Sequence, residues 1–194
     1  MTNADYDLIV VGLGAMGSAV VFHATELGLR VLGLDRFEPP HDLGSTKAET
    51  RITRLAAGEG PQYMPFVRRS HELWRELEAR AGVELLHECG GFIITEQRPV
   101  AGQRWEDFVV ETARIAADAQ IPYDVMQPED VRVVYPWIAV PDGRRVGYEP
   151  TAGLVMSPCS GHGFKHSTAL GEAVAQRIAT GASDLDLEPF RSRP

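Results

Sequence analysis

Two short stretches of the sequence carry residues whose types and spacing suit chemistry. The first is GLGAMG at 12–17, where three glycines follow the pattern Gly-x-Gly-x-x-Gly. The second is SGHGFK at 160–165, where His162 and Lys165 stand close to two glycines. A glycine turn of the first kind is typical of sites that bind a nucleotide phosphate through backbone N–H groups, whereas the second stretch is compatible with several kinds of site.

The elements around the first stretch predict a dinucleotide site. Residues 7–12 form a short aliphatic run that suits a buried parallel strand, and 15–27 follow with a helical pattern. Residues 30–35 are a second apolar strand that ends on Asp35, at about the spacing expected for such a site. Together these segments predict a β-α-β unit and a parallel sheet.

Each residue of the turn has a physical role in this interpretation. Gly12 permits the tight turn, Gly14 lets the backbone approach a pyrophosphate, and Gly17 lets helix and strand pack closely. The start of the helix attracts negative charge, and the Asp35 carboxylate accepts the ribose hydroxyls. The residues expected to bind the cofactor here are Gly12, Gly14, Ala15, Met16, Gly17, Asp35 and Arg36.

The residues alone leave the kind of dinucleotide open. Asp35 disfavours a 2′-phosphate and so argues against NADP, although Arg36 beside it could compensate. FAD and NAD both fit this pattern.

Composition narrows the class of protein. The chain of 194 residues has 44% hydrophobic and 24% charged residues and a formal net charge of −8, which argues against nucleic acid or an anionic membrane as a partner. Two cysteines are too few for a disulfide framework, and the first residues, MTNADYD, do not resemble a signal peptide. These features predict a cytoplasmic protein.

Further elements are predicted from hydrophobic periodicity and from glycine and proline positions. They are helices over 66–81, 105–119 and 167–179, a short helix beginning at Pro128, and a strand over 89–95. We expect Ser167 or Thr168 to cap the last helix and Gly181 to end it.

Longer motifs carry a resemblance to a known family. They are DYDLIVVGLGAMGSAV, LDRFEPPHDLGS, the Thr-Arg-x-x-Arg motif in ETRITR, and SGHGFKHSTALGEAVAQ. On these residues the chain resembles the monomeric sarcosine oxidase and N-methyltryptophan oxidase family. Its members are FAD-dependent amine oxidases with a fold like that of D-amino-acid oxidase.

The resemblance implies how this chain would hold FAD. Ser45 and its neighbours would wrap the pyrophosphate and the isoalloxazine, and Arg51 would lie against the flavin ring. Gly161, His162 and Gly163 would line the pyrimidine side of the flavin, with Lys165 beside them. Because neither Cys89 nor Cys159 stands where some members link the flavin, the FAD is expected to be non-covalent.

The resemblance also implies an activity. Arg54 and Lys165 would clamp the carboxylate of an amino-acid or amine substrate, with Arg51 near the reacting face of the flavin. A C–N bond would be oxidised to an imine by hydride transfer to the flavin, and oxygen would reoxidise the flavin to give peroxide.

The resemblance implies an α/β fold with a Rossmann-like FAD-binding domain and a truncated α+β substrate domain. The FAD-binding domain is expected over 1–88 plus 153–190, and the partial substrate domain over 89–152. Family members are considerably longer, and a large internal segment is expected to be missing between Gly153-Leu154-Val155 and Met156-Ser157-Pro158.

Four alternatives remain beside an active oxidase. One is a catalytically impaired or inactive remnant that binds FAD or another nucleotide, and another is an NAD-dependent dehydrogenase. The others are a hydrolase that uses Ser160 with His162, which lacks a Gly-x-Ser-x-Gly turn, and a metal site formed by Cys159, His162 and His166.

Overall fold

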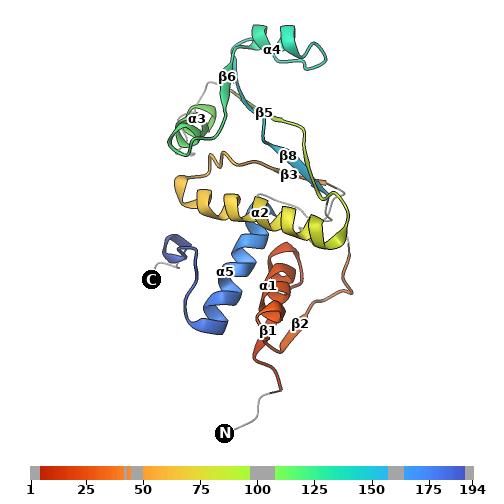
Figure 1. Cartoon of the computed structure of the whole chain (residues 1–194). Helices are drawn as coiled ribbons and strands as arrows, with labels where there is room; N and C mark the ends of the chain where they lie inside the picture. Colours follow the sequence, from red (N-terminus) through yellow and green to blue (C-terminus); the bar gives the residue numbers. More distant parts are fainter. Residues whose placement is uncertain (1–4, 42, 45–49, 97–107, 157–163, 191–194) are drawn as a thin grey trace. The chain divides into compact units, whose positions relative to one another are not determined.

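A computed structural model of the whole chain shows two compact units, each built from separate stretches of sequence (Figure 1). The structure describes residues 5–41, 43–44, 50–96, 108–156 and 164–190. The first unit comprises Met1–Thr53, Pro65–His87 and Val155–Pro194. The second comprises Arg54–Met64 and Glu88–Leu154.

The first unit begins with the β-α-β arrangement that the sequence predicts. Strand β1 (Leu8–Val11) pairs in parallel with β2 (Val31–Leu34), and helix α1 (Ala15–Glu26) connects them. Gly28, at φ +81°, follows the last turn of α1, where a residue without Cβ takes the left-handed conformation most readily. The predicted parallel pair is therefore confirmed.

Helix α5 (Ser167–Thr180) packs directly on α1. A Cβ atom placed on Gly171 would lie 2.5 Å from the Cβ of Ala19 and 2.8 Å from the backbone nitrogen of Val20, so only glycine allows the two helices to approach this closely. The helix ends at Gly181 (φ +81°), as the sequence predicts.

The predicted cap of α5 is wrong. The N-cap residue is His166, which makes no side-chain capping bond, and a short 3₁₀ turn (Phe164–His166) leads into the helix. The hydroxyl of Ser70, in helix α2 (Met64–Ala81), instead accepts a hydrogen bond from the N–H of Ala169 at 3.2 Å. A residue distant in sequence thus satisfies one N–H group of the first turn, which local capping patterns cannot anticipate.

Helix α2 (Met64–Ala81) supplies most of the remaining core of the first unit. Phe66 and Leu73 pack with Ala169 and Ala173 of α5, and Trp74 packs with Leu86. The helix was predicted over 66–81, so the structure confirms it and extends its start to Met64.

Strands β3 (Thr50–Thr53), β8 (Gly153–Met156) and β4 (Leu86–Glu88) form a small sheet in the order β3-β8-β4. Strands this short carry too few residues for a readable alternation of polar and apolar positions, so β3 and β4 were not predicted from the sequence.

The second unit is organised around an antiparallel sheet in the order β5-β7-β6. Strand β7 (Arg144–Glu149) lies between β5 (Gly91–Glu96) and β6 (Asp124–Met126), with Phe92 opposite Tyr148 and Val125 opposite Gly147. The strand predicted over 89–95 is confirmed as β5, with its start shifted to Gly91.

Two α-helices and a 3₁₀ turn (Pro61–Tyr63) complete the described part of the second unit. Helix α3 (Phe108–Asp118) lies within the predicted range of 105–119, and α4 (Pro128–Val134) begins at Pro128 as predicted. The core here is Val131, Val140 and Val146.

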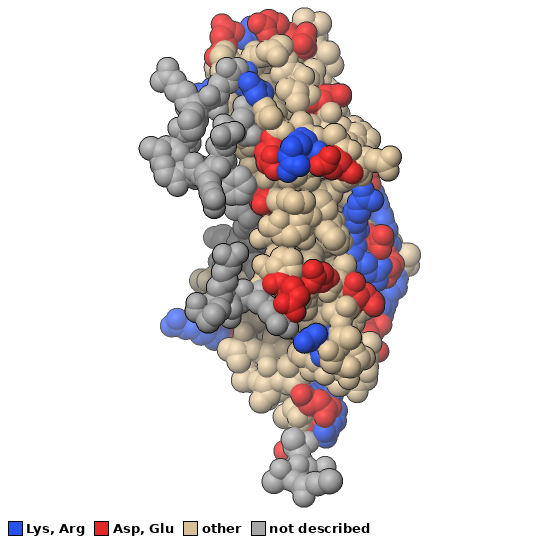
Figure 2. Space-filling view, turned by 90° about the vertical axis from the view of Figure 1, so that its left-hand side faces the viewer, with Lys and Arg blue, Asp and Glu red and all other residues tan. Residues whose placement is uncertain are grey.

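Two further features of the described residues are the distribution of their charged side chains and the hydropathy of their helices. On the face drawn in Figure 2, acidic and basic side chains are interspersed rather than gathered into one basic surface. Across the described residues, no helix combines the length and the apolar character needed to cross a bilayer.

Candidate cofactor site

The first unit contains a cavity of about 900 Å³ beside the Gly-x-Gly-x-x-Gly turn. Its walls come from the start of α1, the end of β2 with the loop after it, α2, and the start of α5. Among the residues predicted to bind the cofactor, Gly14, Ala15, Asp35 and Arg36 line it. A cavity of this volume is in the range of small-molecule and cofactor sites.

The turn at 12–17 has the geometry that its glycines require. Gly12 has φ +94°, and its N–H donates to the carbonyl oxygen of Leu34 at 2.7 Å. A Cβ atom on Gly17 would overlap the carbonyl oxygen of Gly12, so the start of α1 lies too close to the turn for a side chain. Both positions therefore depend on glycine.

The start of α1 is suited to an anion. Its N-cap residue, Gly14, is extended and makes no side-chain capping bond, and the first turn contains no acidic residue. The N–H groups of such a turn and the helix dipole attract negative charge. Because Gly14 and Ala15 line the cavity, this positive end of the helix lies in its wall.

Asp35 is held at the end of β2 by several donors. Its Oδ2 atom accepts the N–H of Leu13 at 2.6 Å, and Oδ1 accepts the N–H of Phe37 at 3.2 Å. The ring Nε2 of His41 lies 3.3 Å from Oδ1. These bonds, the one from Leu13 above all, lower the pKa of the Asp35 carboxyl below its ordinary value, so the group is ionised at neutral pH.

The start of α5 forms another part of the cavity wall. Ser167 and Thr168 line it, and both residues are buried. The Oγ1 atom of Thr168 is buried and has no hydrogen-bond partner among the described residues. A buried hydroxyl without a partner costs free energy, so a ligand acceptor or donor in the cavity would stabilise it.

The predicted catalytic residues lie in different parts of the chain. Arg51 is on β3 and half-buried, and Lys165 is in the 3₁₀ turn before α5 and only 5% exposed; both belong to the first unit. Arg54 belongs to the second unit, where its Nη2 donates to Glu59 at 2.9 Å and its guanidinium lies 5.1 Å from the centre of the Phe108 ring. The clamp formed by Arg54 and Lys165 stays a prediction.

Several predicted site residues lie outside the described residues. These are Ser45 and the turn Gly161, His162 and Gly163, together with Cys159 and Ser160 of the hydrolase and metal alternatives. In the described part of the chain, no group of three or more His, Cys, Asp or Glu side chains is placed to hold a metal ion.

Among the residues of the cavity wall that sequence reasoning missed are His41, Trp74 and Thr168. Trp74 was assigned to the apolar face of a helix and Thr168 to a possible cap. Each of these structural roles already explains the residue type, so nothing in the sequence pointed to a cavity. His41 follows two prolines in FEPPH, where the sequence shows a polar loop and no indication that the chain turns back towards Asp35.

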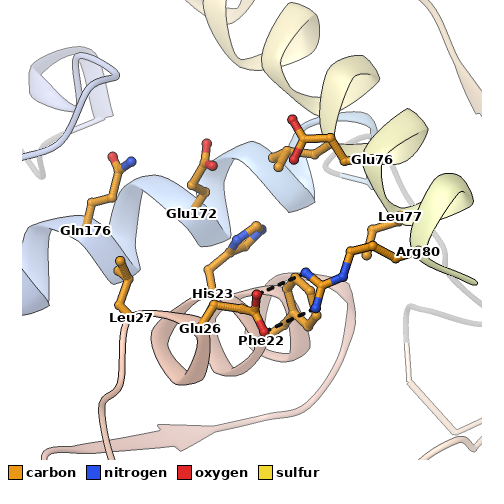
Figure 3. A pocket seen from close by; sticks show the side chains of 10 residues that line it. Phe22, His23, Glu26, Leu27, Glu76, Leu77, Arg80, Glu172 and Gln176 are labelled. Carbon is orange, nitrogen blue, oxygen red and sulfur yellow. Dashed lines mark hydrogen bonds and ion pairs between the residues drawn. The ribbon is translucent and has the colours of Figure 1, made fainter.

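A second, smaller pocket lies between α1, α2 and α5 (Figure 3). It has a volume of about 230 Å³ and shares Phe22, His23 and Leu77 with the wall of the larger cavity. Burial lowers the pKa of His23, and Glu26 pairs with Arg80 at 3.0 Å beside it. This pocket has a wall of paired charges and lacks the glycine turn of the larger cavity.

The larger cavity fits the FAD that the resemblance implies. The start of α1, which has no side-chain cap, would provide N–H groups for a pyrophosphate, and Asp35 would provide an ionised acceptor for ribose hydroxyls. Thr168 would provide a buried polar atom that has no partner among the described residues. When bound, FAD supplies hydride acceptance, while the residues of the chain bind and orient it.

Comparison with known proteins agrees with this site. A family profile described as DAO, FAD dependent oxidoreductase, matches residues 7–158. An N-methyl-L-tryptophan oxidase from Yersinia pestis is 37% identical over 153 residues, which are 79% of this chain and 39% of the relative.

Solved structures show the same fold. NikD, an unusual amino acid oxidase essential for nikkomycin biosynthesis, superposes with a TM-score of 0.64 at 24% identity, over 89% of this chain and 41% of its own. Glycine oxidase from Bacillus cereus superposes with a TM-score of 0.56 at 19% identity, over 91% and 45% of the two chains. The first unit is therefore Rossmann-like, and the predicted α/β fold class is confirmed.

The chain is short for this fold. It spans 39% of the length of the curated relatives that it matches, as expected for a chain shorter than the family members, and the internal position of the missing segment stays a prediction.

Proposed function

Because the chain belongs to the FAD-dependent oxidoreductases of the DAO family, we propose that it binds FAD non-covalently in the large cavity of the first unit. We further propose that it oxidises the C–N bond of a small amino acid or secondary amine to an imine, with oxygen as acceptor and peroxide as product. The observation that carries the proposal is the cavity itself, where the glycine turn, the start of α1 and the ionised Asp35 lie together.

The proposed binding mode follows from the charges around the cavity. The diphosphate of FAD would lie at the start of α1, and a ribose hydroxyl would donate to Asp35. Asp35 would repel a 2′-phosphate, which supports FAD over NADP. Of the other predicted ligands, Arg36 lines the cavity, and Arg51, Ser45, Lys165 and the turn at 161–163 are proposed to contact the flavin half.

The substrate class follows from the predicted cationic residues and from the relatives. N-methyl-L-tryptophan oxidase and glycine oxidase are both named for amino-acid substrates. We propose that Arg54 and Lys165 bind the substrate carboxylate, since a guanidinium fork and an ammonium suit that group. Glu59 already accepts a hydrogen bond from Arg54, so a substrate carboxylate would share or replace that bond.

The test of cofactor binding uses the purified full chain titrated with FAD. We expect visible flavin absorbance to stay with the protein after gel filtration and to be released on acid precipitation, as for a non-covalent flavin. Asp35→Ala should weaken binding by roughly 10-fold or more, since it removes a charged acceptor. A wild-type chain that retains no flavin at saturating FAD would contradict the proposal.

Activity is tested separately, by peroxide production from sarcosine, N-methyltryptophan and glycine by the FAD-loaded chain. Arg54→Met and Lys165→Met should each lower kcat/KM by about 10-fold or more if they hold the carboxylate. Glu129→Gln, at an exposed position on α4, serves as a control that should leave the rate unchanged.

A second candidate function is an FAD-binding protein without oxidase activity. The observation that favours it is the length of the chain, which spans 39% of the length of its relatives. Flavin retained without peroxide from any of the three substrates would support this alternative. Binding of NADH without binding of flavin would instead support a dehydrogenase.

A further inference from the structure

The ring of His41 makes a polar contact through each of its nitrogens. The N–H of Leu43 donates to Nδ1 at 3.1 Å, so Nδ1 acts as an acceptor and carries no proton. In the neutral ring the proton then lies on Nε2, which is 3.3 Å from Oδ1 of Asp35 and donates to it. The contacts of the ring therefore assign its tautomer.

Aromatic packing holds the same ring in place. The Phe37 ring meets the His41 ring edge to face, with 5.2 Å between the centroids. The Arg36 guanidinium lies 5.3 Å from the centre of the Phe37 ring. These three side chains line the cavity and follow directly from the end of β2, so they brace Asp35 from one side of the cavity.

The two oxygens of Asp35 are used unequally. Among the described residues, Oδ1 accepts hydrogen bonds from the N–H of Phe37 and from Nε2 of His41, and Oδ2 accepts one from the N–H of Leu13; the N–H of Arg36 adds a weaker contact to the carboxylate. Because a carboxylate offers about four acceptor positions, two on each oxygen, Oδ2 retains a position for one further donor. The Asp35 side chain is 12% exposed and lines the cavity, so that donor would come from a ligand.

We propose that His41 is a positioning residue for the ribose of the cofactor. By occupying Oδ1, it fixes the plane of the Asp35 carboxylate so that Oδ2 accepts a hydrogen bond from one ribose hydroxyl. Through Leu43 it also ties the loop after β2 to the same carboxylate. This inference rests on the proposed binding of FAD, and it adds that recognition of the ribose depends on a residue that does not touch the ribose.

The test compares binding of ADP, 2′-deoxy-ADP and 3′-deoxy-ADP to the full chain by titration calorimetry. The wild type should prefer ADP over at least one deoxy analogue, which identifies the hydroxyl that donates to Asp35. His41→Phe keeps an aromatic ring against Phe37 and removes both nitrogens. It should bind ADP about 3- to 10-fold more weakly, the effect of one or two hydrogen bonds, and lose most of the preference.

Matched variants distinguish a role of His41 in positioning the Asp35 carboxylate from a role in packing the loop after β2. His41→Gln offers an N–H donor near the place of Nε2 and should keep the preference, whereas His41→Asn can accept from Leu43 but does not reach Asp35 and should lose it. Should His41→Phe fail to fold, as judged by its thermal unfolding, His41→Asn and His41→Gln carry the comparison alone.

Two results would overturn the proposal. One is an unchanged affinity for ADP together with an unchanged preference over its deoxy analogues in His41→Phe and His41→Asn. The other is an equal loss of affinity for ADP and its deoxy analogues, which would assign His41 to loop packing alone. A wild type that binds neither FAD nor ADP contradicts the proposed function itself, so the two failures are distinguishable.

Discussion

Two buried polar groups, Glu149 in the second unit and Thr168 in the first, differ in how their hydrogen-bonding atoms are satisfied. In the second unit the buried Glu149 carboxylate accepts the N–H groups of Leu55 at 2.6 Å and Ala56 at 3.0 Å, and the hydroxyl of Thr151 at 2.9 Å. In the first unit the buried hydroxyl of Thr168 has no partner among the described residues.

This difference distinguishes a group with a structural role from one that is available to a ligand. A buried polar group that is fully bonded stabilises the fold that surrounds it, whereas one left without a partner at a cavity costs stability until a ligand binds. Glu149 is thus satisfied by residues of its own unit, whereas the Thr168 hydroxyl lies in the wall of the proposed cofactor cavity without a partner among the described residues.

The largest expected effect is in the second unit. Glu149→Leu should lower the free energy of unfolding by about 4 kcal/mol, because it leaves two backbone N–H groups buried without an acceptor. Urea denaturation measures the loss, and added FAD should not restore it. Glu149→Gln, which keeps one carbonyl oxygen, should lose less, and equal losses in both variants would contradict the explanation.

Gly17→Ala should act on the first unit instead. The added Cβ overlaps the carbonyl oxygen of Gly12, so we expect a loss of about 2–3 kcal/mol and of FAD binding. Hydrogen exchange should show faster exchange in β1 and α1 and unchanged exchange in β7. The control is Ser18→Ala, at an exposed position of the same helix, and a similar loss there would refute the steric argument.

Thr168→Val tests the unpaired hydroxyl directly. Because the variant removes a buried group that has no partner in the described part of the chain, the protein without cofactor should become about 1 kcal/mol more stable, while the stabilisation by FAD should shrink. Thermal unfolding with and without FAD measures both changes. A variant less stable without FAD would mean that the hydroxyl already has a partner in solution.

The smallest expected effect concerns the ion pair between Asp7, just before β1, and Arg30, just before β2. Arg30 bonds to Asp7 at 2.8 Å and lowers the pKa of its carboxyl to about 2. Since the folded pKa lies below the ordinary value of 3.8, this pair stabilises the fold above that value, and the contribution is lost as pH falls through about 2.

An NMR titration of the Asp7 carboxyl carbon checks this value. Arg30→Met should return the pKa towards 3.8, and high salt should do so in part because both side chains are exposed. A midpoint that does not respond to either change would exclude the ion pair as the cause.

Local patterns in the sequence predicted the part of the fold that depends on near neighbours. Helix α2 follows hydrophobic periodicity, because it is long enough to show one apolar face, whereas the strand-helix-strand segment at the start of the chain and α5 follow from aliphatic runs and glycine positions. The short strands β3, β4, β6 and β7 were not predicted, since their pairing partners are distant in sequence.

The residues of the candidate site also fall into those that sequence spacing predicts and those that only folding brings together. Gly12, Gly17 and Asp35 could be assigned from spacing, because a turn between a strand and a helix constrains residues that follow one another closely. Ser70 as the partner of the Ala169 N–H, Glu149 as the acceptor for Leu55 and Ala56, and His41 as the partner of Asp35 depend on chain segments that meet only in the folded protein.

By itself, the sequence determined the nucleotide-binding turn, the acid that follows it and the resemblance to FAD-dependent amine oxidases. Only the tertiary structure decided which groups surround the cavity and which buried polar atoms lack a partner. The physical reason is that backbone conformation and periodicity are local properties, whereas burial and hydrogen bonding of Asp35, Thr168 and Glu149 depend on distant segments brought together by folding.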